Sequence, residues 1–138
     1  MDIKEQYVSL ETAKLAKEKG FNQYYHQRYN KETGELEYSP CIKHTLKVVD
    51  GKMTRVNITD MTQIFAPTQS LLQRYLREVH NIHILIEFNT LNESYAFFID
   101  YKYNKTYTYC EGDFQNTNFK SYEEALEKGL YQALQLIK

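Results

Sequence analysis

The chain has 138 residues and a formal net charge of −1, with 17 lysines and arginines against 18 aspartates and glutamates. This length suits a single domain over residues 1–138, and the balanced charge excludes a strong overall attraction to nucleic acid or anionic membrane. There are 13 tyrosines and 7 phenylalanines but no tryptophan. A tyrosine ring can pack against apolar groups while its hydroxyl stays in contact with water. The excess of tyrosine therefore favours thin sheets, or surfaces that become buried by self-association.

The N-terminal residues predict a first helix over about 9–19. Ser9 suits the N-cap, Glu11 the first turn, and Gly20 the residue just past the end. The segment has no apolar run of the signal-peptide or membrane-anchor type. We therefore expect a cytosolic protein that makes no membrane contact.

The next part of the chain predicts two hairpins and a short strand. A polar, turn-forming segment at 30–35 separates two candidate strands and indicates the first hairpin. The pair Asp50-Gly51 favours a type I′ turn, because both positions tolerate positive φ, and predicts the second hairpin. Ile64 and Phe65 are then expected to form a short strand.

A second helix, over about 68–80, is predicted to run almost directly into a strand. Pro67 suits its first turn, Thr68 its cap and Asn81 its stop. The helical apolar stripe comprises Leu71, Leu72, Tyr75, Leu76 and Val79. After Asn81 the period changes to two, and one strand face carries Ile82, Ile84, Ile86 and Phe88, while the other carries His83, Leu85 and Glu87. We expect the two apolar stripes to meet in one core.

Residues 95–109 predict a tyrosine-rich hairpin. A turn of two residues sets Tyr101 opposite Thr108, whereas a turn of three residues sets Tyr103 opposite Tyr107. Cross-strand aromatic pairs stabilise a sheet by up to about 1 kcal/mol each. This gain favours the turn of three residues.

A third helix is predicted over about 121–137, where Ser121 and Glu124 form a capping box. Gly129 inside this helix indicates tight packing, because glycine costs about 1 kcal/mol there against alanine. It belongs to a row of small residues, Ala125, Gly129 and Ala133. Consecutive strands joined by short loops predict an α+β fold, with a mainly antiparallel sheet and the three helices packed on one face.

Three segments carry a family resemblance: YVSLETAKLAKEKGF at 7–21, APTQSLLQRYLREVHNIHI at 66–84 and SYEEALEKGLYQALQLI at 121–137. Together they resemble a family of small uncharacterised proteins from bacteriophages and prophages, notably those of gut Bacteroidetes. Tyr75 stands where many relatives have tryptophan. The resemblance implies a phage or prophage origin and action inside a bacterial host, and it assigns no functional residue.

One candidate cluster has metal-ligating residue types: Glu78, His80 and His83. Zinc takes three or four nitrogen, sulfur or oxygen ligands, and an HxxH pair without a fixed third ligand is a weak signal. Polar residues at a helix–strand junction are the favoured interpretation. We therefore expect neither a metal nor another cofactor.

A second group of candidates combines basic and aromatic side chains. Arg74 and Arg77 lie three residues apart on the predicted solvent face of the central helix, and Tyr24, Tyr25 and Arg28 form a comparable group. Such residues hold phosphates or stack bases. The chain has no P-loop, RNP or glycine-rich signature, so a solvated helix face and core tyrosines are the competing interpretation.

Catalysis has the weakest support in the sequence. Cys41 and Cys110 have no CxxC partner or nucleophile motif, and two reduced thiols are expected. The leading expectation is a non-enzymatic interaction module that contacts itself or a host factor through the tyrosine-rich hairpin or the small-residue helix. The alternatives are a nucleotide or nucleic-acid binder, of counter-defence type, and thirdly a metal-dependent hydrolase. The candidate binding residues are Arg74, Arg77, Glu78, His80, His83, Tyr24, Tyr25 and Arg28.

Overall fold

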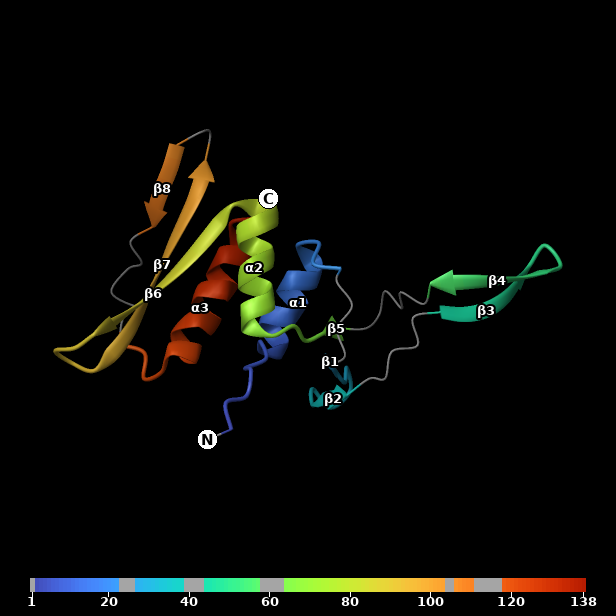
Figure 1. The fold of residues 1–138 in the computed structure, drawn as a ribbon, viewed down its shortest axis with the longest axis horizontal. Helices are drawn as coiled ribbons and strands as arrows, with labels where there is room; N and C mark the ends of the chain where they lie inside the picture. The colour runs from blue at the N-terminus through green and yellow to red at the C-terminus, as the bar shows by residue number, and fades with distance from the viewer. Residues whose placement is uncertain (1, 23–26, 39–43, 58–63, 104–105, 111–117) are drawn as a thin grey trace.

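The computed structural model describes residues 2–22, 27–38, 44–57, 64–103, 106–110 and 118–138, and for 44–49, 54–57, 102–103 and 106–110 it describes the backbone alone. The elements, shown in Figure 1, follow the chain in this order: α1 (Leu10–Glu18), β1 (Gln27–Tyr29), β2 (Leu36–Tyr38), β3 (His44–Val49), β4 (Lys52–Asn57), β5 (Ile64–Phe65), α2 (Gln69–His80), β6 (Ile82–Asn89), β7 (Ser94–Tyr103), β8 (Thr106–Cys110) and α3 (Tyr122–Gln135).

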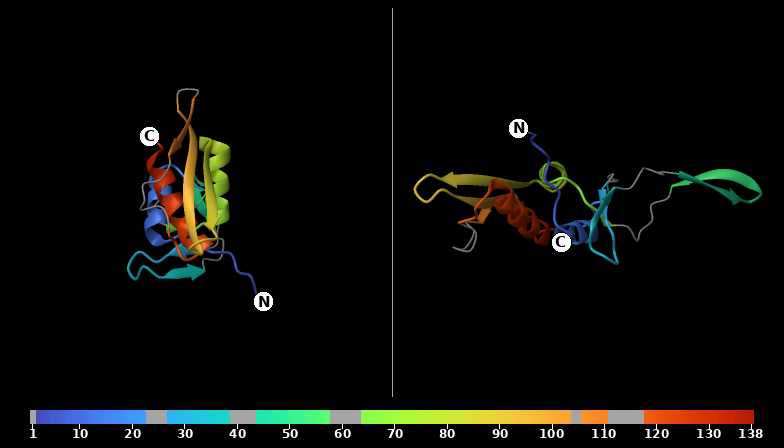
Figure 2. Two further views of the ribbon diagram at one scale, coloured as in Figure 1. Left: turned by 90° about the vertical axis from the view of Figure 1, so that its left-hand side faces the viewer. Right: turned by 90° about the horizontal axis from the view of Figure 1, so that it is seen from below.

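The predicted α+β class with antiparallel strands is confirmed. The described strands divide into three sheets, with the orders β2-β1-β5, β3-β4 and β6-β7-β8. Helices α2 and α3 pack on one face of the β6-β7-β8 sheet, and Figure 2 shows this sheet in front of the helices. Helix α1 reaches the same core differently, because it packs against α3 and β5. Within the described residues, no helix combines the length and the apolar character that a membrane crossing needs.

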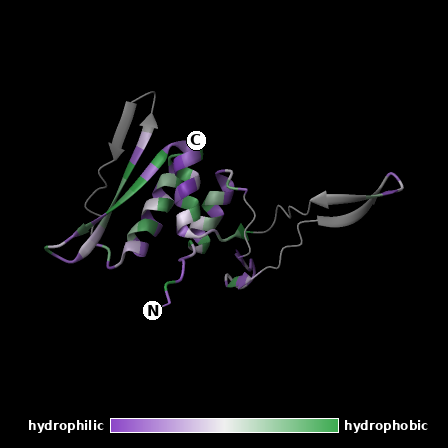
Figure 3. Cartoon of the chain, viewed as in Figure 1, coloured by the Kyte–Doolittle hydropathy of each residue, from purple (hydrophilic) through white to green (hydrophobic). Residues whose placement is uncertain are grey.

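The core lies between the three helices and the inner face of β6 and β7. Its fully or almost fully buried apolar side chains include Val8, Ala16, Leu72, Leu76, Ile82, Ile84, Phe97, Ile99, Leu126, Leu130 and Leu134. Figure 3 shows hydrophobic residues along β6, β7 and the three helices, interspersed with hydrophilic ones. The predicted stripes of the central helix and strand therefore do meet in one core.

Two members of those stripes depart from the prediction. Val79 is 61% exposed and Phe88 is 50% exposed, although both were expected to be buried. Val79 lies in the last turn of α2, and Phe88 lies near the far end of β6. Periodicity identifies the face of an element, but it does not show how far the neighbouring elements extend along that face.

The helix ends largely follow the predicted caps. Ser9, Thr68 and Ser121 each accept a hydrogen bond from the backbone N–H three residues later. Asn81 ends α2 in the left-handed conformation, with φ of 56°. Pro67 lies before the cap of α2 rather than in its first turn, because Thr68 itself is the N-cap.

The capping box of α3 differs from the prediction in one bond. The Ser121 hydroxyl accepts from the Glu124 N–H at 3.1 Å, as expected. The Glu124 carboxylate, however, accepts from the N–H of Lys120 at 3.1 Å. The carboxylate thus reaches one residue further back than in the standard box, and it still satisfies a backbone donor next to the helix start.

The tight packing predicted at Gly129 is confirmed. A Cβ atom at this position would lie 2.8 Å from Ile84 Cγ2 and 3.3 Å from the Phe97 ring. The other small residues of the row, Ala125 and Ala133, are fully buried. All three small residues are buried within the molecule, with Gly129 against the sheet, so this helix face is not exposed in the way that an interface requires.

The register of β7 and β8 corrects the predicted turn. Tyr103 pairs with Thr106 and Tyr101 with Thr108, so two residues separate the strands and not three. Tyr107 is therefore opposite Lys102 and not opposite a tyrosine. Two-residue connections match the twist of the flanking strands, and this preference outweighs the modest gain from aromatic pairs.

The two earlier hairpins and the short strand are present. β1 pairs with β2 and also with β5, and β3 pairs with β4. Asp50 and Gly51 both have positive φ, 52° and 74°, as the predicted type I′ turn requires.

Candidate functional site

The predicted basic and acidic residues of α2 lie on its exposed surface. Arg74 Nε is 2.8 Å from Glu78 Oε1, an ion pair between two exposed side chains one helical turn apart. Arg77 is also exposed. Exposed pairs of this kind contribute about 0.3–0.5 kcal/mol. Because Glu78 offsets the charge of Arg74, Arg77 is the residue that leaves α2 a net positive charge.

The two candidate histidines have different neighbours and do not form one site. His80 Nε2 lies 3.1 Å from the Tyr75 hydroxyl, and the two rings meet edge to face. His83 Nε2 lies 3.3 Å from Asn81 Oδ1. The described part of the chain contains no group of three His, Cys, Asp or Glu side chains that could hold a metal ion.

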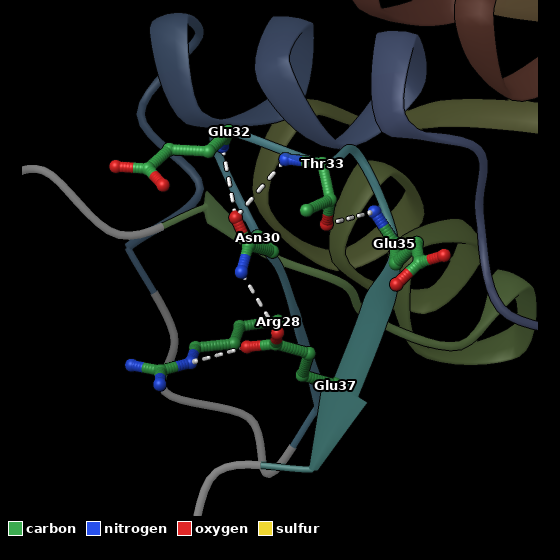
Figure 4. A network of polar contacts seen from close by, with 6 residues as sticks. All are labelled: Arg28, Asn30, Glu32, Thr33, Glu35 and Glu37. Atoms are coloured by element: carbon green, nitrogen blue, oxygen red, sulfur yellow. Dashed lines mark hydrogen bonds and ion pairs between the residues drawn. The ribbon is translucent and has the colours of Figure 1, made fainter.

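Arg28 lies on β1, in a different region from α2. Its Nε is 3.9 Å from Glu37 Oε2 on the neighbouring strand β2 (Figure 4). Glu37 Oε1 also accepts a hydrogen bond of 2.8 Å from Asn30 Nδ2. The predicted partners of Arg28, Tyr24 and Tyr25, lie outside the described residues.

The rest of the polar network in Figure 4 builds the β1–β2 turn. Asn30 Oδ1 accepts from the N–H groups of Glu32 and Thr33, at 2.8 and 3.1 Å. Thr33 Oγ1 accepts from the N–H of Glu35 at 3.3 Å. These are the side-chain to backbone bonds that shape a tight connection. Arg28 therefore belongs to a structural network.

The half-buried carboxylate of Glu127, which no pattern in the sequence marks, joins the helices. Glu127 Oε1 accepts from the Ser9 N–H at 2.9 Å and from the Thr12 hydroxyl at 2.6 Å. Glu127 Oε2 accepts from Gln69 Nε2 at 3.1 Å. The carboxylate on α3 thus holds the starts of α1 and α2, and its charge lies where the α1 dipole favours an anion.

A cavity of about 550 Å³ lies beside Glu127. Its lining carries charges of both signs, from Lys4, Glu123, Glu124 and Lys128. Burial and, less strongly, the charge of Glu127 raise the pKa of the Tyr29 phenol on the same wall. Three donors, from Ser9, Thr12 and Gln69, already bind the Glu127 carboxylate. We therefore assign this carboxylate a structural role, which is to stabilise the packing of the helices.

The outer edge of β6 is the surface with the clearest capacity for binding. Among the described strands, none lies on its other side, because β6 ends the β6-β7-β8 sheet. The Tyr95 N–H and carbonyl both bond to Phe119, at 2.8 and 3.0 Å, and so point away from β6. Phe88, which pairs with Tyr95, therefore directs its own backbone groups outward.

Backbone direction alternates along a strand, so the same applies to every second residue of β6. The residues with outward backbone groups are Ile82, Ile84, Ile86 and Phe88. A separate contact agrees, because Gln73 Nε2 reaches the Ile84 carbonyl from α2 at 3.1 Å. We call this row of backbone groups, together with the β6 side chains, the β6 edge.

The β6 edge also exposes apolar side chains on both faces of the sheet. Leu85 is 49% exposed on the face away from the helices, opposite the half-buried Phe98. Phe88 is 50% exposed on the other face, with its ring 4.9 Å from that of Tyr95. The sequence signal for this surface was Leu85 between His83 and Glu87 on one face of the predicted strand, but the sequence does not show which strand ends a sheet.

The comparisons with known proteins add no relative. Neither a family model, nor a curated protein, nor a solved structure matches this chain.

Proposed function

We propose that this protein is a non-enzymatic protein-binding module and that the β6 edge is its contact surface. A protein chain that binds there extends the β6-β7-β8 sheet by one strand. Backbone hydrogen bonds provide affinity in this mode of recognition, and alternate side chains provide specificity.

The observation that carries the proposal is that no described strand pairs with the outer side of β6, where the one hydrogen bond described above comes from Gln73 of α2 to the Ile84 carbonyl. Proteins usually prevent edge-to-edge pairing with a short strand, charged side chains (lysine above all), a proline, a bulge, or a helix or loop that covers the edge. β6 has eight residues, IHILIEFN, without lysine or proline. It pairs with β7 residue for residue from Ile82 to Asn89, so no bulge interrupts it. An edge with these properties is suited to a partner strand.

Two further arguments support a protein partner. The basic candidates Arg74 and Arg28 each lie beside a glutamate, which weakens the case for nucleic acid. The resemblance to phage and prophage proteins suggests that the partner is found inside a bacterial host.

Site-specific photo-crosslinking in bacterial cells tests this function. A photo-reactive phenylalanine analogue replaces Leu85, and the matched control carries it at Lys14, an exposed position on α1. We expect a light-dependent protein adduct from position 85 that withstands nuclease treatment and is absent from position 14. Equal yields at both positions, or no adduct at position 85, would overturn the proposal.

A further inference from the structure

We infer that the strand that binds the β6 edge is β6 of a second copy of this chain. The two strands run antiparallel around a two-fold axis at Leu85, and the two sheets join into one. This inference rests on the proposed function and identifies its partner. The argument comes from the direction of the backbone groups and from the order of side chains along β6.

Backbone direction limits how two β6 strands can pair. The groups of Ile82, Ile84, Ile86 and Phe88 point outward, and hydrogen bonds form only where two outward residues are opposite each other. Pairing an even-numbered residue with an odd-numbered one brings an outward group against an inward one. A symmetric pair is therefore centred on a residue, and the centres near the middle of the strand are Ile84, Leu85 and Ile86.

Side-chain order selects among these three centres. A pair centred on Leu85 places Leu85 against Leu85 of the second copy and His83 against Glu87 of the second copy. A pair centred on Ile84 places His83 against Leu85, and one centred on Ile86 places Leu85 against Glu87. Polar groups opposite apolar ones are less favourable than matched pairs. Only the pair centred on Leu85 places apolar side chains opposite apolar ones and polar side chains opposite polar ones along this face.

The inner face of the joined sheet is matched in the same register. Ile84 lies against Ile86 of the second copy, and Ile82 against Phe88, so the half-exposed Phe88 ring gains an apolar neighbour. The backbone of Ile84 and Ile86 forms the hydrogen-bonded pairs on either side of the axis. The bond from Gln73 to the Ile84 carbonyl is compatible, because a carbonyl oxygen has two lone pairs.

Polar complementarity favours a second copy over an unrelated strand. On the outer face, His83 faces Asp100 within its own sheet, whereas Glu87 faces Ala96. The second copy supplies Glu87 with a histidine at the cross-strand distance, and the two-fold axis makes the contact twice. An unrelated strand would need a similarly complementary order to match I-H-I-L-I-E-F at every position.

Charge reversal tests the register through sedimentation equilibrium of the full chain. His83→Glu places two glutamates opposite each other at both contacts, and Glu87→Lys places lysine opposite His83. We expect each single variant to raise the dimer Kd roughly tenfold. We expect Leu85→Lys, with two lysines on the axis, to raise it at least a hundredfold. Lys14→Glu on α1 is the matched control and leaves the Kd unchanged.

Mixing the two charge variants gives the decisive result. His83→Glu and Glu87→Lys each pair poorly with themselves, but together they form a heterodimer in which the new glutamate of one chain faces the new lysine of the other. We expect the mixture to bind within about threefold of the wild-type Kd. A loss of folding cannot produce this recovery, because each partner must fold to bind the other.

The possible results separate this inference from the proposed function. A wild-type chain that stays monomeric up to about 1 mM overturns the inference, and so does a dimer that ignores both charge variants. If position 85 then crosslinks to a different protein, the proposed function stands without the second copy. Dimers weakened by each variant and restored in the mixture support both.

Discussion

A Cβ atom at position 129 would lie 2.8 Å from Ile84 Cγ2 and 3.3 Å from the Phe97 ring, so the missing side chain sets the spacing between α3 and the sheet. Both neighbours are buried, and Phe97 is only 2% exposed. Neither can move without disturbing the core on its other side, because protein interiors are close-packed.

Gly129→Ala should therefore destabilise the protein despite its better helix propensity. Overpacking costs about 1–3 kcal/mol, and alanine recovers about 1 kcal/mol of propensity, so the expected net loss is up to about 2 kcal/mol. Urea unfolding followed by circular dichroism measures it. Lys128→Ala, exposed on the same helix, should change stability by less than about 0.5 kcal/mol. A Gly129→Ala variant as stable as wild type would show that the sheet moves aside readily.

Tyr29 reports on the contact that Glu127 makes between the helices. Burial first, and the charge of Glu127 second, raise the pKa of its phenol above the ordinary value of 10.0. In Glu127→Gln the pKa should fall but stay above that value, because burial remains. Titration of carbon-labelled tyrosine by NMR measures the change, with Tyr29→Phe to assign the signal. An unchanged pKa would contradict the charge contribution.

The same shift gives stability a defined dependence on pH. Because the folded pKa lies above the unfolded one, the folded state retains its proton longer. The stabilisation is complete below about pH 10 and is lost as the pH rises through the folded pKa. The decline in unfolding free energy above pH 10 should be shallower in Tyr29→Phe than in wild type, and equal slopes would contradict it.

At the scale of elements, the α2–β6 junction depends on Asn81, whose φ of 56° ends the helix and starts the strand without a loop. Asparagine adopts the left-handed region more readily than most residues, and glycine adopts it without strain. Asn81 Oδ1 also lies 3.3 Å from His83 Nε2. This residue therefore fixes the direction in which β6 leaves α2.

Asn81→Ala should destabilise the protein by about 1 kcal/mol, because alanine is strained in the left-handed region. Asn81→Gly should be within about 0.5 kcal/mol of wild type or slightly more stable. Thermal unfolding of both variants measures the difference. If alanine and glycine were equivalent, backbone strain would not be the reason for asparagine here.

The elements that the sequence predicted well are those with local signals. The caps Ser9, Thr68 and Ser121, the stop at Asn81 and the turn at Asp50-Gly51 are each specified by one or two neighbouring side chains. Such signals depend on local hydrogen bonds and on φ preferences, so they can be read without the rest of the fold.

The features that the sequence did not predict depend on distant contacts. The exposure of Val79 and the burial of the α3 small-residue face depend on what lies beside each element. The candidate site shows the same limit. In the sequence Glu127 is an ordinary helix residue. In the structure it binds Ser9 and Gln69, which are both distant from it along the chain.

For the whole molecule, the main asymmetry is that the helices cover one face of the β6-β7-β8 sheet while no described strand pairs with the outer side of β6. If a second copy binds there, folding and association become linked, because only the folded chain presents the edge. A partner that binds the native state alone adds about 2.7 kcal/mol of stability at a hundred times its Kd.

The midpoint temperature of unfolding should therefore rise with protein concentration. From well below the dimer Kd to about a hundredfold above it, we expect an increase of roughly 5 °C or more for a chain of this size. Leu85→Lys should remove this dependence, because lysine on the two-fold axis prevents pairing while the exposed position leaves the fold intact. Differential scanning calorimetry over this concentration range measures both proteins. A wild-type midpoint that does not change across the range would mean that the open edge and the stability of the fold are independent.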